Sequence, residues 1–158
     1  MPAKAKLLQT SAFALCSFII CSVAHALQVD SGVVDWSPTI NTPNGCRKMQ
    51  LRALADTGTD GGVYNHGTVT SRTCTGSIAN QPAGWIGSDL GGYMNGGLCG
   101  FSTSYSTSSL AVFNQGAHGF CWPNPAGTQS FYTDIGGGFW NGSGYTWLGY
   151  QLSPTLNF

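Results

Sequence analysis

The sequence contains very little charge, and one acidic residue type is missing from it altogether. Only 8% of the 158 residues are charged, and all six acidic residues are aspartates because the chain has no glutamate. A nucleic-acid-binding protein needs clustered Lys and Arg, and a bundle of amphipathic helices needs charged outer faces. A chain with six basic residues fits neither class. Disorder is excluded as well, because 42% of the residues are hydrophobic.

The first 26 residues have the features of a secretory signal peptide. A short segment with two lysines precedes an apolar run over 7–24, and Ala24 and Ala26 supply the small residues of a cleavage site. The run is at the short limit for spanning a bilayer, which favours a cleaved leader over a membrane anchor. We therefore expect a signal peptide over 1–26, one secreted domain over 27–158, and no membrane span after cleavage.

Cysteine is scarce once this leader is removed. The four that remain are Cys46, Cys74, Cys99 and Cys121. An even number of cysteines in an exported chain predicts two disulfides. The shortest loops favour Cys46–Cys74 and Cys99–Cys121, although four cysteines allow two other pairings. Their separations of 28, 25 and 22 residues do not resemble the close Cys-x-x-Cys pairs of a zinc site, so we expect no bound metal.

Glycine is abundant, with 23 residues that all follow position 26. Between glycine-rich segments lie short stretches in which apolar and polar residues alternate, as is typical of β-strands. These predicted strands cover 29–36, 68–75, 98–105, 110–113, 119–122, 130–135 and 145–152. We expect an all-β protein: an antiparallel β-sandwich or compact barrel of about eight short strands, with glycine-rich loops and two disulfides.

Residues 46–55 are ambiguous. Met49, Leu51 and Ala53 alternate with polar residues as in a strand, whereas the residue types in the segment are good helix formers. A lone short helix would be marginally stable among β-strands. We therefore interpret the segment as a strand and keep the helix as the alternative.

A degenerate motif of Ser or Thr, Asp, glycines, an apolar or aromatic pair and Asn recurs at 59–67, 88–97 and 133–143. Asn and Gly tolerate positive φ, and Asp caps its own turn, so the first interpretation is repeated hairpin-turn chemistry. The alternative is internal structural repetition that presents equivalent pockets. The uneven spacing of the copies argues against a regular repeat fold.

Aromatic rings beside Asn and Asp are typical of a sugar-binding surface, because a pyranose ring stacks on an aromatic face while polar side chains bind its hydroxyls. The candidate ligand-binding residues are Trp85, Asp89, Tyr93, Asn95, Asp134, Trp140 and Asn141. Tyr145 and Trp147 lie on a predicted strand, where we expect them to fill the core. Convergence of the Asp and Asn residues on one face would favour a binding site.

Catalytic and metal-binding patterns are sparse. After position 26 the histidines are His66 and His118, which we interpret as solvated or bonded to backbone rather than as acid–base catalysts. The segment 56–61 has acids at the first and fifth positions of a calcium loop but lacks the later ligands, so calcium binding there stays open. No cofactor is expected.

These observations predict a secreted, non-catalytic recognition module that binds a glycan or another extracellular surface through loop aromatics and Asn or Asp. The first alternative is a structural subunit that self-associates in an extracellular assembly. It is supported by a net charge of only −2 after position 26, from four basic and six acidic residues. The second alternative is a small secreted hydrolase that uses His66 or His118. No nucleic-acid partner is expected.

Overall fold

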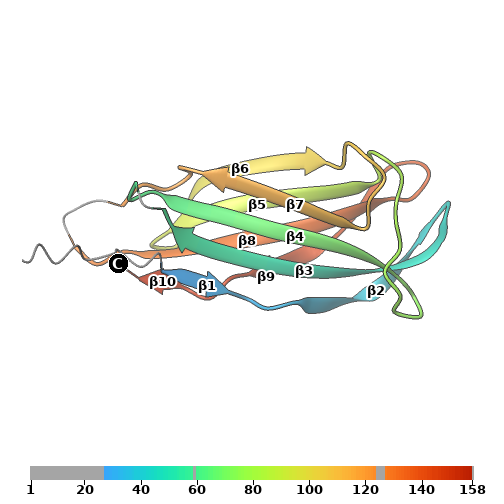
Figure 1. The fold of residues 1–158 in the computed structure, drawn as a ribbon, viewed down its shortest axis with the longest axis horizontal. Helices are drawn as coiled ribbons and strands as arrows, with labels where there is room; N and C mark the ends of the chain where they lie inside the picture. The colour runs from blue at the N-terminus through green and yellow to red at the C-terminus, as the bar shows by residue number, and fades with distance from the viewer. Residues whose placement is uncertain (1–26, 59, 124–126, 158) are drawn as a thin grey trace, which may run out of the picture.

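A computed structural model describes residues 27–58, 60–123 and 127–157, which form an elongated sandwich of two antiparallel β-sheets (Figure 1). The prediction of an all-β sandwich is therefore confirmed. The predicted signal peptide over 1–26 lies outside the described residues. Within the described ranges, no helix has the length and apolar character needed to cross a membrane.

The first sheet, called sheet A, faces the viewer in Figure 1. Its strands are β1 (Gln28–Asp30), β2 (Val34–Thr42), β3 (Gly45–Thr57), β4 (Val63–Thr73) and β7 (Val112–His118). Both β1 and β2 pair with β3, along successive parts of its length. Strand β3 then pairs with β4, and β4 pairs with β7.

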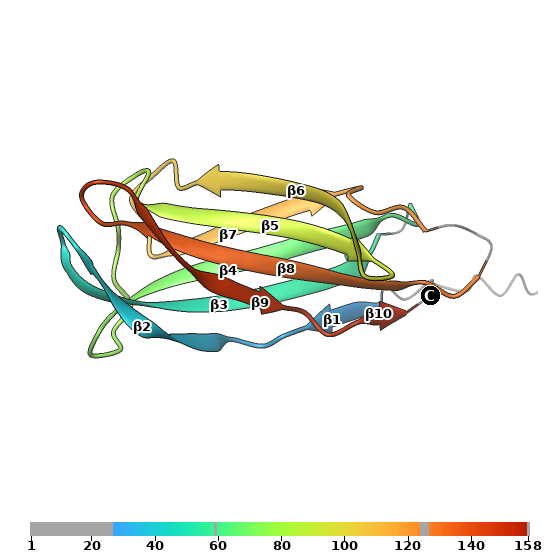
Figure 2. The same ribbon diagram turned by 180° about the vertical axis from the view of Figure 1, so that it is seen from behind.

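The second sheet, called sheet B, faces the viewer in Figure 2. Its strands are β5 (Ile86–Met94), β6 (Gly97–Tyr105), β8 (Ser130–Trp140), β9 (Tyr145–Leu152) and β10 (Leu156–Asn157). The arrangement repeats that of sheet A, because β9 and β10 both pair with β8, which pairs with β5, which pairs with β6. In each sheet, therefore, two long strands occupy the centre.

The core lies between the inner faces of the four central strands. Buried residues alternate with less buried ones along β3 and β4, whereas β5 and β8 are buried at nearly every central position. The largest contributions to the core come from Met49, Leu51, Val69, Ile86, Leu90, Ile135 and Phe139. Glycine lets the sheets approach closely at two points. A Cβ on Gly137 would overlap Met49 and Leu51, and one on Gly67 would overlap Ile135. The inner faces pack on each other through hydrophobic clusters, and a buried hydrogen bond also joins them, since Asn65 of β4 donates to Thr133 of β8 at 2.7 Å.

Two disulfides cross-link the sandwich, in the pairing that the shortest loops favour. Cys46–Cys74 joins the paired ends of β3 and β4, with 5.6 Å between the Cα atoms. Cys99–Cys121 joins β6 of sheet B to the segment that follows β7 of sheet A. Each bond stabilises the fold by about 3 kcal/mol, mainly by restricting the unfolded chain.

Several strand boundaries differ from those predicted. Segment 46–55 is part of strand β3, as we interpreted it, but the predicted strand over 29–36 is divided between β1 and β2, and Gly32 between them has φ +68°. The predicted loop between 113 and 119 is wrong, because this polar segment is most of β7. Its side chains are bonded to neighbouring strands: Asn114 Oδ1 accepts from Thr68 Oγ1 at 2.9 Å, for example.

Candidate functional site

The second and third copies of the repeated motif lie on β5 and β8 and pair with each other. Leu90 lies opposite Ile135, Asp89 opposite Gly136, and Asp134 opposite Gly91. The pairing is therefore symmetric about the Leu90–Ile135 pair. Leu90 and Ile135 are fully buried in the core. Because neighbouring residues of a strand point to opposite faces, both aspartates lie on the outer face of sheet B.

The interpretation of these two segments as turns is wrong for most of their length. Turns occur only where the copies end. Asn95 has φ 51° between β5 and β6, and the Asn141 side-chain oxygen accepts from the N–H groups of Ser143 and Gly144 at 3.0 Å. Strand pairing overrides the local preference of Asp and Gly for turns, since each segment forms a ladder with strands on both sides.

Glycine occupies the remaining outward positions at the centre of sheet B, where rings from strand β9 lie over the bare backbone. A Cβ on Gly138 would lie 2.9 Å from Cδ2 and 3.2 Å from Cε2 of Trp147. One on Gly136 would lie 2.6 Å from Cε1 of Tyr150. The two side chains are nevertheless 38% and 50% exposed. Each ring thus lies against glycine on one side and meets solvent on the other.

Further aromatic side chains extend this surface to both ends of the sheet. On β6, Phe101 and Tyr105 are exposed, and the Tyr105 ring lies 4.8 Å from that of Tyr145. Near the other end, Tyr93 and Tyr132 stack with their centroids 4.7 Å apart. We call this surface the aromatic face. It comprises Asp89, Tyr93, Phe101, Thr103, Tyr105, Tyr132, Asp134, Tyr145, Trp147, Tyr150 and the outward glycines Gly87, Gly91, Gly136 and Gly138.

Asp89 and Asp134 occupy the centre of the aromatic face and are bonded only to neutral groups. Thr103 donates to Asp89 Oδ1 at 2.6 Å, and the Tyr150 hydroxyl donates to Asp89 Oδ2 at 3.4 Å. The Tyr93 hydroxyl donates to Asp134 Oδ2 at 3.1 Å. Asp134 Oδ1 is buried and has no hydrogen-bond partner of normal geometry. As whole residues, Asp89 and Asp134 are 9% and 7% exposed.

Burial dominates the electrostatics of this centre. It raises the pKa of Asp134, an effect that the nearby Asp89 charge increases and that the Tyr93 hydroxyl and backbone N–H groups partly oppose. Burial likewise raises the pKa of Tyr93 and Tyr150, and the adjacent carboxylates raise each further. Burial thus makes Asp134 harder to ionise, and the Tyr93 and Tyr150 hydroxyls remain protonated donors beside the acids.

The structure brings together three of the seven predicted ligand-binding residues: Asp89, Tyr93 and Asp134. Trp85 and Trp140 lie close to one another at one end of sheet B, where the backbone N–H of Trp140 donates to the backbone carbonyl of Trp85 at 3.0 Å. Both are half-buried.

Asn95 and Asn141 do not join the other candidates. They lie in the turns after β5 and after β8, at opposite ends of sheet B. Asn95 Oδ1 accepts from the Ser130 N–H at 3.0 Å, and Asn141 caps its own turn. The acids therefore converge on one face, whereas the two asparagines hold turns.

Sequence reasoning missed the most exposed rings of the aromatic face. The expectation that Tyr145 and Trp147 fill the core is wrong. Trp147 lies on the outer face over Gly138, and Tyr145 lies on the same face, half-buried. Tyr150, Tyr105 and Phe101 were not singled out. The available clue was glycine at alternate positions of β8, which leaves room for large side chains from a neighbouring strand. That clue becomes useful only when the strand pairing is known.

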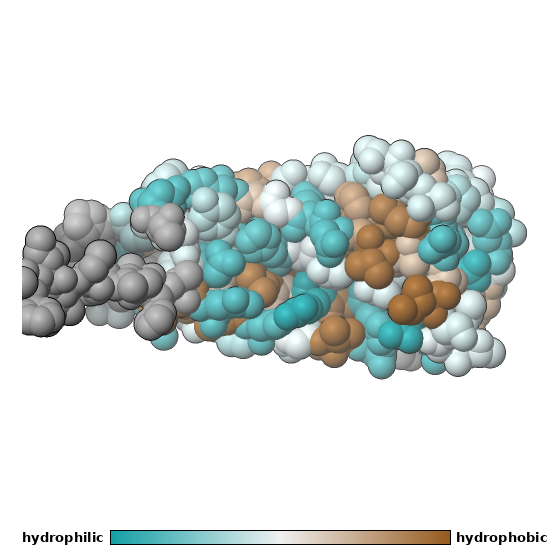
Figure 3. Space-filling view, in the orientation of Figure 1, coloured by the Kyte–Doolittle hydropathy of each residue, from teal (hydrophilic) through white to brown (hydrophobic). Residues whose placement is uncertain are grey.

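The histidines lie on the outer face of sheet A, which carries both hydrophilic and hydrophobic patches (Figure 3). His66 Nε2 is 3.6 Å from Asp56 Oδ2, and His118 Nε2 is 2.9 Å from Asp60 Oδ2. Tyr64 stacks on His118 at 4.0 Å. The two acids of segment 56–61, the possible calcium loop, thus lie beside histidines. Among the described residues, no group of three or more His, Cys, Asp or Glu could hold a metal ion. In that same part of the chain, neither histidine is hydrogen-bonded to a hydroxyl or thiol that could act as a nucleophile.

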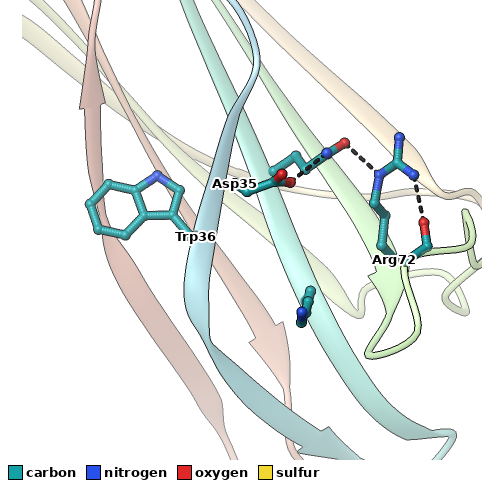
Figure 4. Close-up of a pocket in the computed structure, with 6 residues that line it drawn as sticks. Asp35, Trp36 and Arg72 are labelled. Carbon is teal, nitrogen blue, oxygen red and sulfur yellow. Dashed lines mark hydrogen bonds between the residues drawn. The ribbon is translucent and has the colours of Figure 1, made fainter.

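A pocket of about 200 Å³ also opens on sheet A, between β2, β3 and β4 (Figure 4). Gln50 donates to Asp35 and accepts from Arg72, which in turn donates to the Gly76 carbonyl at 2.6 Å. Trp36 lies on the other side of β2 from this hydrogen-bonded chain (Figure 4). The polar groups of the pocket largely satisfy one another, and no exposed ring forms a stacking surface there.

Comparison of the chain with models of protein families, with curated proteins and with solved structures gives no match. The case for a function therefore rests on the geometry of the aromatic face.

Proposed function

We propose that the protein is a secreted, non-catalytic recognition module and that its aromatic face binds the sugar rings of a glycan. The observation that carries this proposal is the exposure of Trp147 and Tyr150 above glycine. Rings that lie against backbone are held in place, so stacking on their outer side costs little conformational entropy. A pyranose ring presents the flat C–H face that such stacking requires.

Exposed apolar side chains lie on both flanks of the aromatic face. Six large apolar or aromatic side chains on the flanking strands of sheet B are exposed: Leu98, Phe101, Tyr105, Trp147, Tyr150 and Leu152. A contiguous patch of this kind on a soluble protein marks an interaction surface. Its polar centre of carboxyl and hydroxyl groups supplies hydrogen bonds for sugar hydroxyls.

The dimensions favour an extended chain of sugars over a single one. Strand β8 carries Tyr132 at one end of the aromatic face and Gly138, beneath Trp147, at the other. Six residues of β-strand span about 20 Å. The face is also open to a ligand along its length, because the flanking strands contribute aromatic side chains to it and do not enclose it with backbone.

Secretion is part of the proposal. The leader-like composition of 1–26 supports it, and the two disulfides are compatible with an extracellular protein. N-terminal sequencing of the exported protein tests it. A start at Leu27 is expected, and retention of the first 26 residues in the exported protein would contradict the assignment.

Titration with a panel of soluble oligosaccharides tests the proposal, with tryptophan fluorescence and backbone amide NMR shifts as readouts. We expect amide shifts on β5, β8 and β9 and a loss of affinity of about tenfold or more in Trp147→Ala. Trp122→Ala is the matched control, because Trp122 is 56% exposed but packs beside His118 of sheet A. No response across the panel, or equal losses in both variants, would contradict glycan binding at this face.

The same exposed side chains favour a second candidate, a structural subunit that self-associates through sheet B. Low charge would allow close contact between copies. Light scattering over a concentration series separates the candidates: association that Phe101→Ser abolishes supports the subunit, whereas a monomer at all concentrations excludes it.

A further inference from the structure

The two acidic residues that account for the net charge after position 26 lie at the centre of the aromatic face. After Arg72 the sequence contains only two charged residues, Asp89 and Asp134, and the fold places them on adjacent strands of one face. The strands and loops of sheet A hold four bases and four acids, which balance. The net charge of −2 after position 26 therefore comes from these two carboxyl groups.

The fold gains no stability from this arrangement. Two aspartate residues that are 9% and 7% exposed lie on paired strands, and no strand of their sheet carries Lys, Arg or His. Burying a carboxylate without a cationic partner is unfavourable, and asparagine would fill the same volume at lower cost. Buried acids that a fold does not need are candidates for a role in binding.

The site lacks a cationic partner for its two acids, and an ammonium group on a ligand would provide one. It donates charge-assisted hydrogen bonds to carboxylates, and aromatic faces attract it through their quadrupole. Carboxylates repel an anionic ligand, and a neutral hydroxyl leaves their charge uncompensated. A free alkylammonium lacks a ring to stack on Trp147 and Tyr150. The complete complement to this face is a sugar ring that carries an amino group.

The neighbours of Asp89 on the central strands are glycines. It lies between Gly87 and Gly91 on its own strand and opposite Gly136, so the groups that cover it come from the flanking strands. The Tyr150 ring covers it, and its hydroxyl bonds Asp89 at 3.4 Å, a long distance for such a bond. A charged donor can therefore compete with this weak contact for Asp89 Oδ2 while the Tyr150 ring stays over Gly136.

We propose that the aromatic face selects glycans that bear free amino groups, with the sugar rings on Trp147 and Tyr150 and the ammonium groups bound to Asp89 and Asp134. This inference rests on the proposed function, since it specifies the ligand of the same face. It predicts a preference that depends on charge and not on ring shape.

Three β-1,4-linked hexasaccharides test it, because they differ only in the substituent on carbon 2: a hydroxyl, an N-acetyl group or a protonated amine. Calorimetric titration at about pH 6, below the pKa of an amine, gives three affinities. We expect the amino hexasaccharide to bind about tenfold tighter or more than the other two, as one charge-assisted hydrogen bond provides. The advantage decreases as salt is added.

Isosteric variants assign the preference to residues. In Asp89→Asn and Asp134→Asn we expect the ratio of the amino to the hydroxyl affinity to fall toward one. Asp30→Asn, on β1 of the opposite sheet, is the matched control and keeps the full ratio. Circular dichroism and the melting temperature verify that each variant is folded.

The outcomes separate this inference from the proposed function. Equal affinities for the three hexasaccharides would overturn the amino-glycan assignment and leave glycan binding intact. Binding of none would overturn both. Spermine, a polyamine without sugar rings, is the last comparison: affinity equal to that of the amino hexasaccharide would show that stacking contributes nothing and would overturn the assignment to a glycan.

Discussion

The outer faces of the two sheets occupy equivalent positions in the sandwich but have opposite surfaces. On sheet A the central strands carry long polar side chains, including Lys48, Gln50, Arg52 and Arg72, which bond to one another or extend into solvent. On sheet B the same positions carry four glycines and two aspartates. On sheet A these long side chains cover the backbone of the central strands. On sheet B the central backbone is bare at the glycines, and aromatic rings from the flanking strands lie over it.

This difference shows that the inner and outer faces of the sandwich are subject to different packing constraints. Both inner faces are filled with similar apolar side chains, because one core joins them. The outer faces are under no common packing constraint. Sheet B therefore tolerates glycine at outward positions, where a polar β-branched residue would serve the fold better. This departure from ordinary strand composition is one reason for proposing that sheet B carries the binding surface.

The largest expected effect on the free energy of unfolding distinguishes aromatic rings in the core from those of the aromatic face. Phe139 is fully buried, so Phe139→Ala is expected to lower the free energy of unfolding by about 4 kcal/mol. Trp147 is 38% exposed, and Trp147→Ala is expected to cost about 1 to 2 kcal/mol. Urea denaturation measures both. Equal losses would mean that the aromatic face is a second core and not a binding surface.

Adjacent glycines on β8 separate the two faces of one strand. Gly137 faces Met49 and Leu51 in the core, so Gly137→Ala is expected to destabilise the protein by about 2 kcal/mol through overpacking. Gly138 faces only the Trp147 ring, which can move outward, so Gly138→Ala is expected to cost less than about 1 kcal/mol.

Ligand titration of the same pair completes the comparison. Gly138→Ala tilts the Trp147 ring and is expected to weaken glycan binding about tenfold, whereas Gly137→Ala leaves the affinity unchanged. Weaker binding by Gly137→Ala alone would mean that the ligand site lies elsewhere.

The sequence predicts the fold class and the disulfides because these depend on signals that are local or countable. Alternation identifies β-strands, and an even number of cysteines predicts disulfides, which here are the two that close the shortest loops. The aromatic face depends instead on register. Asp89 and Asp134 are 45 residues apart in sequence, and nothing local shows that each lies opposite a glycine of the other's strand. The exposure of Trp147 likewise depends on Gly138, a residue of the neighbouring strand.

A smaller effect follows from the burial of Asp134. Burial raises the pKa of this carboxyl in the folded protein, so ionisation is harder there than in the unfolded chain. As pH rises through the folded-state pKa, wild-type protein therefore loses stability that Asp134→Asn retains. At about pH 7 the variant is expected to be about 1 kcal/mol more stable, and the difference disappears at about pH 3. Urea denaturation at both pH values measures it, and a less stable variant at pH 7 would contradict the cost assigned to the buried acid.

The smallest effect concerns an aspartate of sheet A and should have the opposite sign. Arg52 donates to Asp30 at 2.9 Å and lowers the pKa of that carboxyl, so the pair contributes stability above the ordinary range of an aspartate pKa and loses it as pH falls through the folded-state value. Because both side chains are partly exposed, Asp30→Asn is expected to cost only about 0.5 kcal/mol at pH 7, less in high salt and nothing at low pH. A double-mutant cycle with Arg52→Gln measures the coupling. If Asp30→Asn and Asp134→Asn shifted stability in the same direction at pH 7, the electrostatic contrast between the two faces would be refuted, because only a compensated acid is costly to remove.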